Sequence, residues 1–471
     1  MELSSFGLFN SLILLFYIIS LIIIGFTFSK RNKSLDNFFL GNRNLPWLPV
    51  AMSIFASVTS ATTLIAVPGL IIDQNISFIS IGLASLLVAP IIIKIFYSKY
   101  HENKITTSYQ YLMIRFGTKA QHYTGFLYIF FRLSWLGLVI YAPALALNIT
   151  TDISIFTCIL LIGIISTIYA SLGGISAVIW TDVIQFTFLL IGIIWISILL
   201  PNQIDGGINT IIETSKISGK FDVMNWSNLT TLSLPIIGIH FFLQLMYDYG
   251  TDQITVQRMM ATGSQTKTTK AIFFNALADV LIISLLIFIG LGLFTFYSLN
   301  SLPENIIGDK ILPYYIINEL PNGLSGLLIT SIFAAAMSSM DSGINTISTV
   351  LIKDIPIKLN KNLKVAKIIS ISIGLIATII ALFISNTENL LIENFYKFMS
   401  LLCAPILALF IMGVLTKNSN IKGWLFGLTG SIAITLWIQH KELIHIMYLF
   451  TCSFIICLIL GITFSYLFKK A

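Results

Sequence analysis

The sequence predicts an all-α fold, that of a polytopic membrane protein with about 13 transmembrane helices. Composition is the first reason: of the 471 residues, 56% are hydrophobic and 10% are charged, and the mean hydropathy is +0.91. Soluble domains carry about 25% charged residues, and no soluble fold of this size buries so much apolar surface. The second reason is that apolar runs long enough to span a bilayer recur along the whole chain.

The predicted spans follow one another with short connections. The first has neither the basic leading region nor the small-residue cleavage site of a signal peptide, so we expect it to be retained. In order, the predicted spans are 7–28, 46–72, 76–97, 121–148, 153–171, 175–200, 233–250, 270–298, 322–352, 364–386, 389–415, 421–438 and 443–468.

Lysine and arginine gather in alternate loops, which indicates the orientation of the chain. If the N-terminus lies outside, the outer loops hold only Lys216, Lys220, Lys310 and Lys441, and the inner loops hold the clusters. We therefore expect a multi-pass protein of the cell membrane, in bacteria the inner membrane, with an outer N-terminus and a cytoplasmic C-terminus. Because the net charge of +7 lies in these short loops, the lipid bilayer is the expected partner and nucleic acid is not.

The whole chain, 1–471, is expected to form a single transmembrane domain. We expect 7–28 to be an extra N-terminal helix, 46–250 to hold core helices one to six, and 270–415 to hold core helices seven to ten. Two extra C-terminal helices follow in 421–468. The ten core spans divide into two groups of five, and because five is odd the groups would have opposite orientations, as in transporters built from inverted repeats.

The most informative segment is 334–346 (AAAMSSMDSGINT), which places polar residues inside a predicted span. A carboxylate and several hydroxyls are costly in lipid and usually mark an ion or substrate pathway. Small oxygen ligands at this density suit a hard cation such as Na+. The polar residues recur at three- and four-residue steps and so share one helix face: Ser338, Asp341 or Ser342, Asn345 and Thr349.

The second span is rich in hydroxyls and is followed by Pro68 and Gly69. A single Ser or Thr in a membrane helix usually bonds its own i−4 carbonyl or packs against a neighbour. So many together favour an unwound stretch, whose free carbonyls can coordinate a cation. The hydroxyl residues are Ser53, Ser57, Thr59, Ser60, Thr62 and Thr63.

Charged residues inside spans are the other candidates. Asp182 is expected to bind a cation or take part in proton-linked coupling, with helix capping or an interfacial position as the alternative. Arg132 is either a guanidinium fork for a substrate carboxylate or half of an internal ion pair. Asp248 is a weaker site candidate, and Asp252 is expected to be structural, close to Arg258.

No enzyme motif is present in the sequence, so we do not expect an enzyme. There is no Walker loop, no Gly-x-Ser-x-Gly elbow and no His-Glu-x-x-His, and the five histidines are scattered.

Several segments, in order along residues 7–468, resemble the sodium:solute symporter family. They are 37–47 (NFFLGNRNLPW), 141–147 (YAPALAL), 173–185 (GGISAVIWTDVIQ), 252–258 (DQITVQR), 309–314 (DKILPY) and the 334–346 segment. The segments 138–143 and 249–253 look closest to the monocarboxylate, multivitamin and bacterial sialic-acid branches. The resemblance implies a LeuT-like 5+5 inverted repeat, in which the second to eleventh spans are the core helices.

The resemblance also implies two Na+ sites. In the first, carbonyls of the first and eighth core helices and two hydroxyls of the eighth bind the ion, which here are Ala56, Thr59, Ala335, Ser338 and Ser339. The second, known from some bacterial members, would use Asp182, Ser338, Asp341 and Ser342. Asp341 stands where a hydroxyl serves in relatives, so it either strengthens that site or binds a proton instead.

For the substrate, the resemblance implies that Arg132 holds a carboxylate and that Ser60, Thr63 and Phe78 line the same pocket. Gly82 departs from the polar residue expected for sialic acid, which favours a different and smaller organic acid. Val58 and the threonines at 62 and 63 disfavour a galactose-type site.

The implied function is a sodium-coupled secondary active symporter that imports a small organic solute, expected to be an organic anion such as a monocarboxylate, a sialic acid or a vitamin-like acid. The alternatives are a proton-coupled symporter of the same fold, working through Asp182 or Asp341, and a membrane sensor that binds a solute without transport. Because the chain stops three residues after Phe468, we expect no C-terminal signalling module, which disfavours the sensor.

Overall fold

The computed structural model describes residues 7–29, 34–59, 61–150, 153–224, 232–304, 306–321, 323–356, 362–386 and 391–468. Every regular element in these ranges is a helix, which confirms the all-α membrane fold. Ten of the described helices are long and apolar enough to cross a membrane, and one bent pair raises the number to eleven. The predicted count of about 13 spans stays a prediction, because the predicted spans 153–171 and 233–250 correspond to shorter helical segments.

The N-terminal part runs from the first predicted span through the broken second span. Helices α3 and α4 are separated at the hydroxyl-rich stretch, and the axes of Trp47–Val58 and Thr63–Asp73 differ by 52°. The elements are α1 (Leu8–Ser29), α2 (Leu35–Leu40), η1 (Gly41–Arg43), α3 (Trp47–Val58), α4 (Ala61–Asp73), η2 (Ile76–Ile79), α5 (Ser80–Ile92), η3 (Ile93–Tyr97) and α6 (Ser98–Glu102).

The next part contains the longest helix of the described ranges. The predicted spans 153–171 and 175–200 lie in one helix, α9, which bends at Gly174, where φ is 61° and ψ is −173°. Glycine adopts such a conformation without steric penalty, so a kink replaces the expected loop. The elements are α7 (Ser108–Phe116), α8 (Thr118–Thr150), α9 (Ile155–Asn202) and α10 (Gly207–Ile217).

The C-terminal half contains the segment with the polar stretch, α15. Its elements are α11 (Leu234–Gly250), α12 (Gln253–Ala261), α13 (Gln265–Leu299), η4 (Gly308–Lys310), α14 (Ile311–Asn318), α15 (Leu324–Lys353), α16 (Leu363–Ile384), α17 (Leu391–Phe398), η5 (Met399–Cys403), α18 (Ala404–Leu415), α19 (Ile421–His440), η6 (Ile446–Tyr448) and α20 (Leu449–Leu467).

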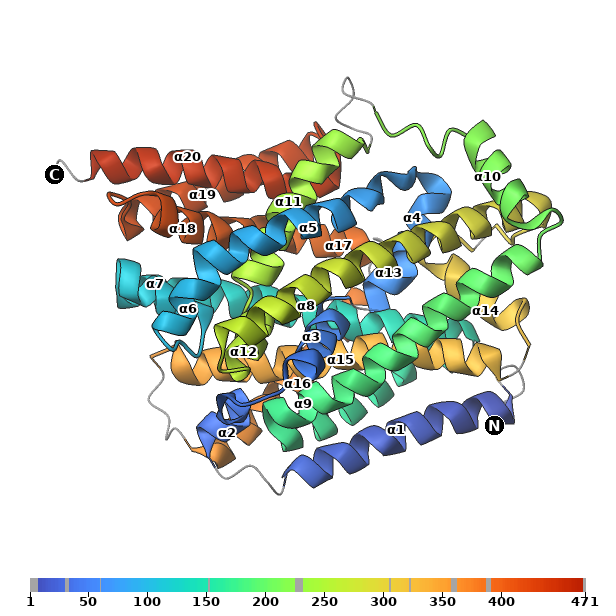
Figure 1. Cartoon of the computed structure of the whole chain (residues 1–471), viewed down its shortest axis with the longest axis horizontal. Coiled ribbons are helices and arrows are strands. Elements are labelled where there is room, and N and C mark those ends of the chain that lie inside the picture. The colour runs from blue at the N-terminus through green and yellow to red at the C-terminus, as the bar shows by residue number, and fades with distance from the viewer. Residues whose placement is uncertain are drawn as a thin grey trace.

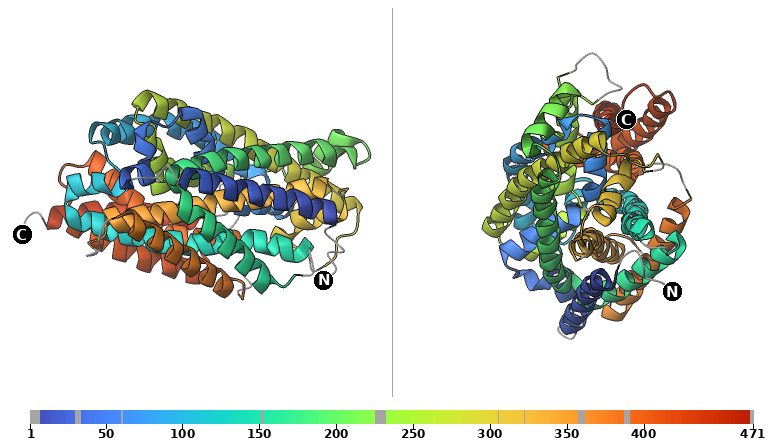
Figure 2. Two further views of the ribbon diagram at one scale, coloured as in Figure 1. Left: turned by 90° about the horizontal axis from the view of Figure 1, so that it is seen from below. Right: turned by 90° about the vertical axis from the view of Figure 1, so that its right-hand side faces the viewer.

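The long helices run along one axis of the molecule, with α15 inside and α1, α19 and α20 on the flanks (Figures 1 and 2). Of the apolar window in α15, 94% is buried, against 22% in α1. Because lipid takes the place of water around such a protein, exposed apolar side chains such as Phe16 and Trp437 belong on the outer helices. The interior helix can therefore carry polar groups that lipid would exclude.

Candidate functional site

The broken helix ends against the polar face of α15. Carbonyls in the last turn of a helix can accept hydrogen bonds from groups outside the helix. The Ser339 hydroxyl donates to the carbonyl of Ser57 at 3.0 Å, and Ala56 and Ala335 are both buried. The predicted residues of the first Na+ site therefore lie on two elements that are in direct contact, the end of α3 with its cap Thr59 and the middle of α15.

A second cluster, the serine network, joins α3, α9, α12 and α15. Asp182 is fully buried, and it accepts hydrogen bonds from Ser338 at 2.6 Å and from Ser53 at 2.5 Å. Beside it, Asp341 accepts a hydrogen bond from Ser342 at 3.2 Å. The network consists of Ser53, Ser57, Asp182, Arg258, Ser338, Asp341 and Ser342, and it brings together all four residues predicted for the second Na+ site.

Arg258 supplies the positive charge of the serine network, a role that the sequence did not predict. Its Nη2 lies 3.3 Å from the Asp182 carboxylate and also donates to Ser342, and its Nε donates to Ser53 at 2.7 Å. Asp252 has structural contacts, as expected of it, but its ion pair is with Arg132, while Arg258 pairs with Asp182. Asp252 caps the N-terminus of α12, and six residues of helix rotate Arg258 to a different side.

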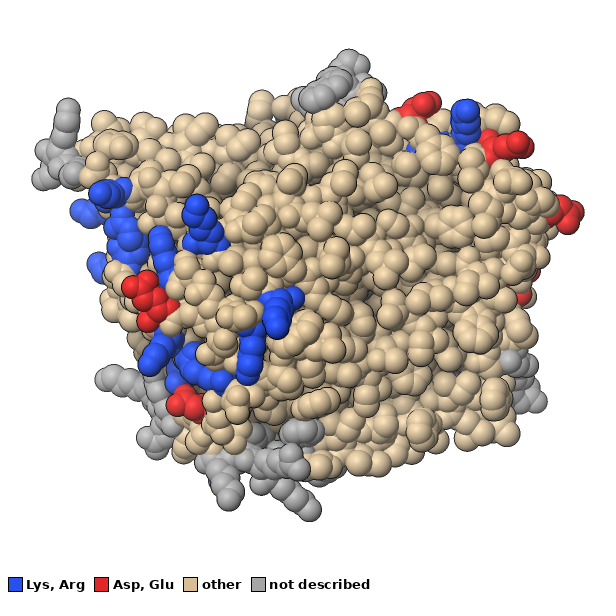
Figure 3. All heavy atoms as spheres, in the orientation of Figure 1, with Lys and Arg blue, Asp and Glu red and all other residues tan. Residues whose placement is uncertain are grey.

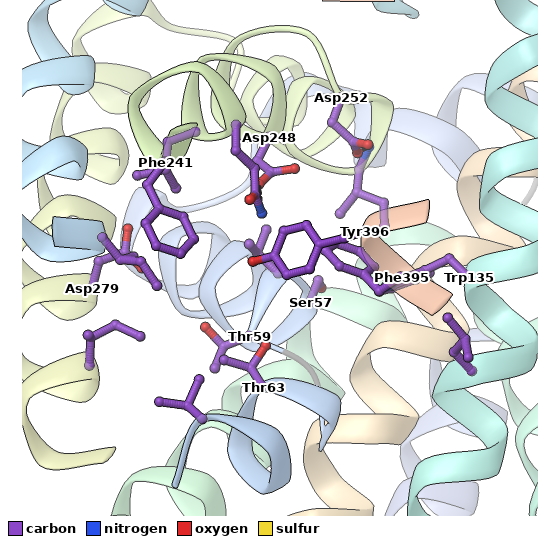
Figure 4. Close-up of a pocket in the computed structure, with 18 of the residues that line it drawn as sticks. Ser57, Thr59, Thr63, Trp135, Phe241, Asp248, Asp252, Asp279, Phe395 and Tyr396 are labelled. Carbon is purple, nitrogen blue, oxygen red and sulfur yellow. Dashed lines mark hydrogen bonds between the residues drawn. The ribbon is translucent and has the colours of Figure 1, made fainter. Parts of the chain in front are cut away.

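A cavity of about 130 Å³ opens beside the helix break, between α4, α8, α11, α13 and α17 (Figure 4). Three of the predicted substrate residues, Thr63, Phe78 and Arg132, line it. Ser60, the fourth, lies outside the described residues. Thr59, predicted for the first Na+ site, lines it as well, so the ion site and the solute cavity would share a wall.

Arg132 forms an internal ion pair, one of the two interpretations of it, and the other, a fork for a substrate carboxylate, stays a prediction. Its Nη2 forms an ion pair with Asp252, and the guanidinium lies 4.4 Å from the ring centroid of Trp135. The side chain nevertheless lines the cavity, and its Nε has no hydrogen-bond partner. The ion pair holds the guanidinium in place and leaves donors for a solute.

Two further carboxylates line the same cavity. Asp279 of α13 accepts hydrogen bonds at one oxygen, from Ser85 at 2.5 Å and from Tyr249 at 2.9 Å. Asp248 of α11 receives a 3.4 Å contact from the Gln244 amide. We call Arg132, Asp248, Asp252 and Asp279 the cavity wall. Asp279 was not predicted as a site residue, although a carboxylate within the predicted span 270–298 was a usable signal.

Gly82, the position that departs from the sialic-acid pattern, does not face open space. A Cβ there would lie 3.0 Å from the Cα of Val280 in α13. A polar side chain at this position would therefore require α13 to move. Glycine supplies no polar side chain at this position, and α13 leaves little space for one.

The chain resembles a family model, several known proteins and a solved structure. The family model described as "Sodium:solute symporter family" matches residues 38–430. The sodium/sialic acid symporter NanT of Aliivibrio fischeri is 29% identical, over 100% of this chain and 95% of that protein. The sodium-coupled monocarboxylate transporter 2 of Danio rerio is 29% identical, over 92% of this chain and 71% of that protein. A solved structure of a Na+-coupled sialic acid symporter in a substrate-bound outward-open state is 28% identical, with a TM-score of 0.90 over 98% of both chains.

Proposed function

The chain belongs to the sodium:solute symporter family, and we propose that it is a sodium-coupled secondary active symporter that imports a small organic acid by alternating access. One observation carries this proposal: a helix broken at its polar stretch is hydrogen-bonded to α15 directly beside a cavity that Arg132 lines. The relatives named for sialic acid and for monocarboxylates share a carboxylate in their solutes, and Arg132 is the group that would hold it.

We propose that the first Na+ binds between the end of α3 and α15. Carbonyls of Ala56, Thr59 and Ala335 and the hydroxyls of Ser338 and Ser339 are neutral oxygen donors, the kind that suits a hard monovalent cation. The burial of these residues and the contact between Ser339 and the Ser57 carbonyl support the site. Na+ there would tie the two halves of the core together and order the cavity. A solute would then bind more tightly, which is positive coupling.

The second cation site that we propose is the serine network. With both carboxyl groups ionised, Asp182 and Asp341 would carry two negative charges, and Arg258 would compensate one of them. Binding one monovalent cation would therefore neutralise the cluster, which favours ions of charge +1. That ion is Na+ in our proposal, with Ser338 and Ser342 as further ligands. The same charge balance keeps a proton on Asp341 as the alternative, and with it proton coupling.

The topology that we propose has 13 spans in one domain, with a LeuT-like 5+5 inverted repeat and an outer N-terminus. Helix α1 begins at one end of the molecule and α20 ends at the other (Figure 1), as an odd number of crossings requires. On the face in Figure 3, most of the lysine and arginine gathers at the end where α20 finishes, with some acidic residues among them, and the opposite end shows mainly acidic residues. The positive-inside rule makes the basic end cytoplasmic, in the bacterial inner membrane.

The test is uptake into proteoliposomes that contain the purified chain. Radiolabelled lactate and N-acetylneuraminate would be offered under an inward Na+ gradient, under a proton gradient and under neither. Uptake driven by Na+ alone supports the proposal, and uptake driven by protons alone supports the proton-coupled alternative. Saturable binding without accumulation under any gradient would contradict transport and support a sensor.

A further inference from the structure

The cavity wall contains more carboxyl groups than an acid-binding site needs. Three carboxylates and one guanidinium line the cavity, and the guanidinium is already paired with Asp252. Within the described part of the chain, neither Asp248 nor Asp279 forms an ion pair with a lysine or arginine. A solute that carried only a carboxylate would add a further negative charge to this wall, which a partly desolvated site disfavours.

The two unpaired acids lie on the side of the cavity formed by α11 and α13. On α11, Phe241, Gln244 and Asp248 recur at steps of three and four residues, so that they share the face that lines the cavity. Asp279 approaches from α13, and the rings of Phe241 and Tyr396 lie near the two carboxylates (Figure 4). Arg132 comes from α8, a different element. The wall therefore has an arginine on one helix and unpaired acids on two others.

We infer that the solute is a zwitterion, whose carboxylate binds Arg132 and whose ammonium group binds between Asp248 and Asp279. This inference rests on the proposed function and narrows its solute class. The ammonium would donate charge-assisted hydrogen bonds to the acids and face the rings of Phe241 and Tyr396, which attract cations. A metal cation is the other positive ligand to consider. No cluster of three or more His, Cys, Asp or Glu suited to a metal exists in the described ranges, and this disfavours it.

Matched pairs of compounds test this inference on the full chain. L-proline is compared with cyclopentanecarboxylate, and L-leucine with 4-methylpentanoate, since each pair differs by the amino group. The readout is Na+-dependent thermal stabilisation, together with solute-induced current in proteoliposomes. We expect half-saturation by a zwitterion at about tenfold or more lower concentration, the discrimination that a hydrogen bond to a charged group supplies.

Variants test whether Asp248 and Asp279 cause the preference for zwitterions over plain acids. In Asp248→Asn and Asp279→Asn, the ratio between the members of a pair should approach one, because zwitterion binding weakens while binding of the plain acid does not. Glu213→Gln removes an exposed acid of α10 and should keep the ratio of the unchanged chain. Na+-dependent stabilisation without solute shows that each variant is folded.

Three outcomes would overturn the inference. The first is that plain acids, or N-acetylneuraminate, bind the unchanged chain as tightly as the best zwitterion. The second is that the two asparagine variants keep the discrimination. The third is that they shift the half-saturating Na+ concentration and leave the discrimination intact, which would assign the wall to a metal cation. In each case Na+-dependent binding persists, so the result would contradict the zwitterionic solute class and leave the proposed symporter function in place.

Discussion

The serine network and the cavity wall are built from the same residue types, and they differ in what surrounds the acids. Each contains one arginine and more than one aspartate. In the network, Asp182 accepts hydrogen bonds from Ser53 and Ser338, and α3, α9, α12 and α15 close around it. In the wall, Asp248 and Asp279 line a cavity of about 130 Å³.

The difference indicates how one membrane protein separates two tasks. Hydroxyl partners and close packing hold the carboxylates of the network in fixed positions, which suits a small ion and a link between helices. The wall leaves space for a solute and keeps its charges at the surface of that space. Ser57 links the two regions, because it belongs to the network and also lines the cavity. The coupling proposed between ion and solute would pass through this residue.

The largest effect is expected from removing Arg258, the positively charged side chain of the serine network. Arg258→Gln leaves two buried carboxylates without compensation, which costs about 3–5 kcal/mol when a buried pair is broken. Thermal unfolding of the purified protein should show a large fall in Tm. Arg258→Gln combined with Asp341→Asn should recover part of the loss, because the second change removes one of the uncompensated charges. An unchanged Tm in the single variant would contradict the role of Arg258.

A smaller and more local effect is expected from the arginine of the cavity wall. Arg132→Gln removes the charged donor from the solute site and also leaves Asp252 unpaired. Solute binding should weaken by about ten- to a hundredfold, the range for a hydrogen bond to a charged group of roughly 1.5–3 kcal/mol. The half-saturating Na+ concentration without solute should change little. Titration of both ligands separates the effects, and Arg132→Lys, which keeps the charge but not the fork, should fall between.

The sequence was sufficient for the all-helical membrane fold and for much of the network, while the 13 spans and the inverted repeat stay predictions. The apolar runs predicted the helices, and the polar spacing on α15 correctly placed Ser338, Asp341 and Ser342 near one another. The kink at Gly174 was not predicted, since a glycine pair reads equally well as a short loop. Whether these residues bind Na+ stays a prediction.

The partners across helices could not be predicted from the sequence. The spacing of polar and apolar residues predicts which residues share a face of one helix. It does not predict which faces of different helices pack together. Arg258 reaches Asp182 across 76 positions of sequence, and Ser53 reaches it across 129. Asp279 stood alone in an apolar run, and only the packing of α5 and α11 against α13 gave it partners.

Substituting the hydroxyl residues of α15 tests directly whether Na+ binds in the serine network. Ser338→Ala removes a proposed ligand of both Na+ sites and a hydrogen bond to Asp182. We expect the half-saturating Na+ concentration to rise about tenfold, equivalent to about 1.4 kcal/mol. Ser348→Ala on the same helix is the matched control, because its buried hydroxyl bonds Ser370 and the Ile344 carbonyl instead. Equal Na+ dependence in the two variants would contradict the proposed sites.

The smallest effect is expected at the ion pair between Lys353 and Asp36. Like the two regions, it joins a basic side chain to an aspartate, but it lies at the surface. Its nitrogen and oxygen are 3.7 Å apart, and the Asp36 side chain is 75% exposed. Water and salt screen such a pair, so Asp36→Asn should change the free energy of unfolding by less than about 1 kcal/mol. Thermal unfolding at low and high salt measures it, and the two proteins should converge as salt rises. If Asp36→Asn lowered the free energy of unfolding as much as Arg258→Gln, the loss of a charge pair, and not the burial of that pair, would determine the size of the effect.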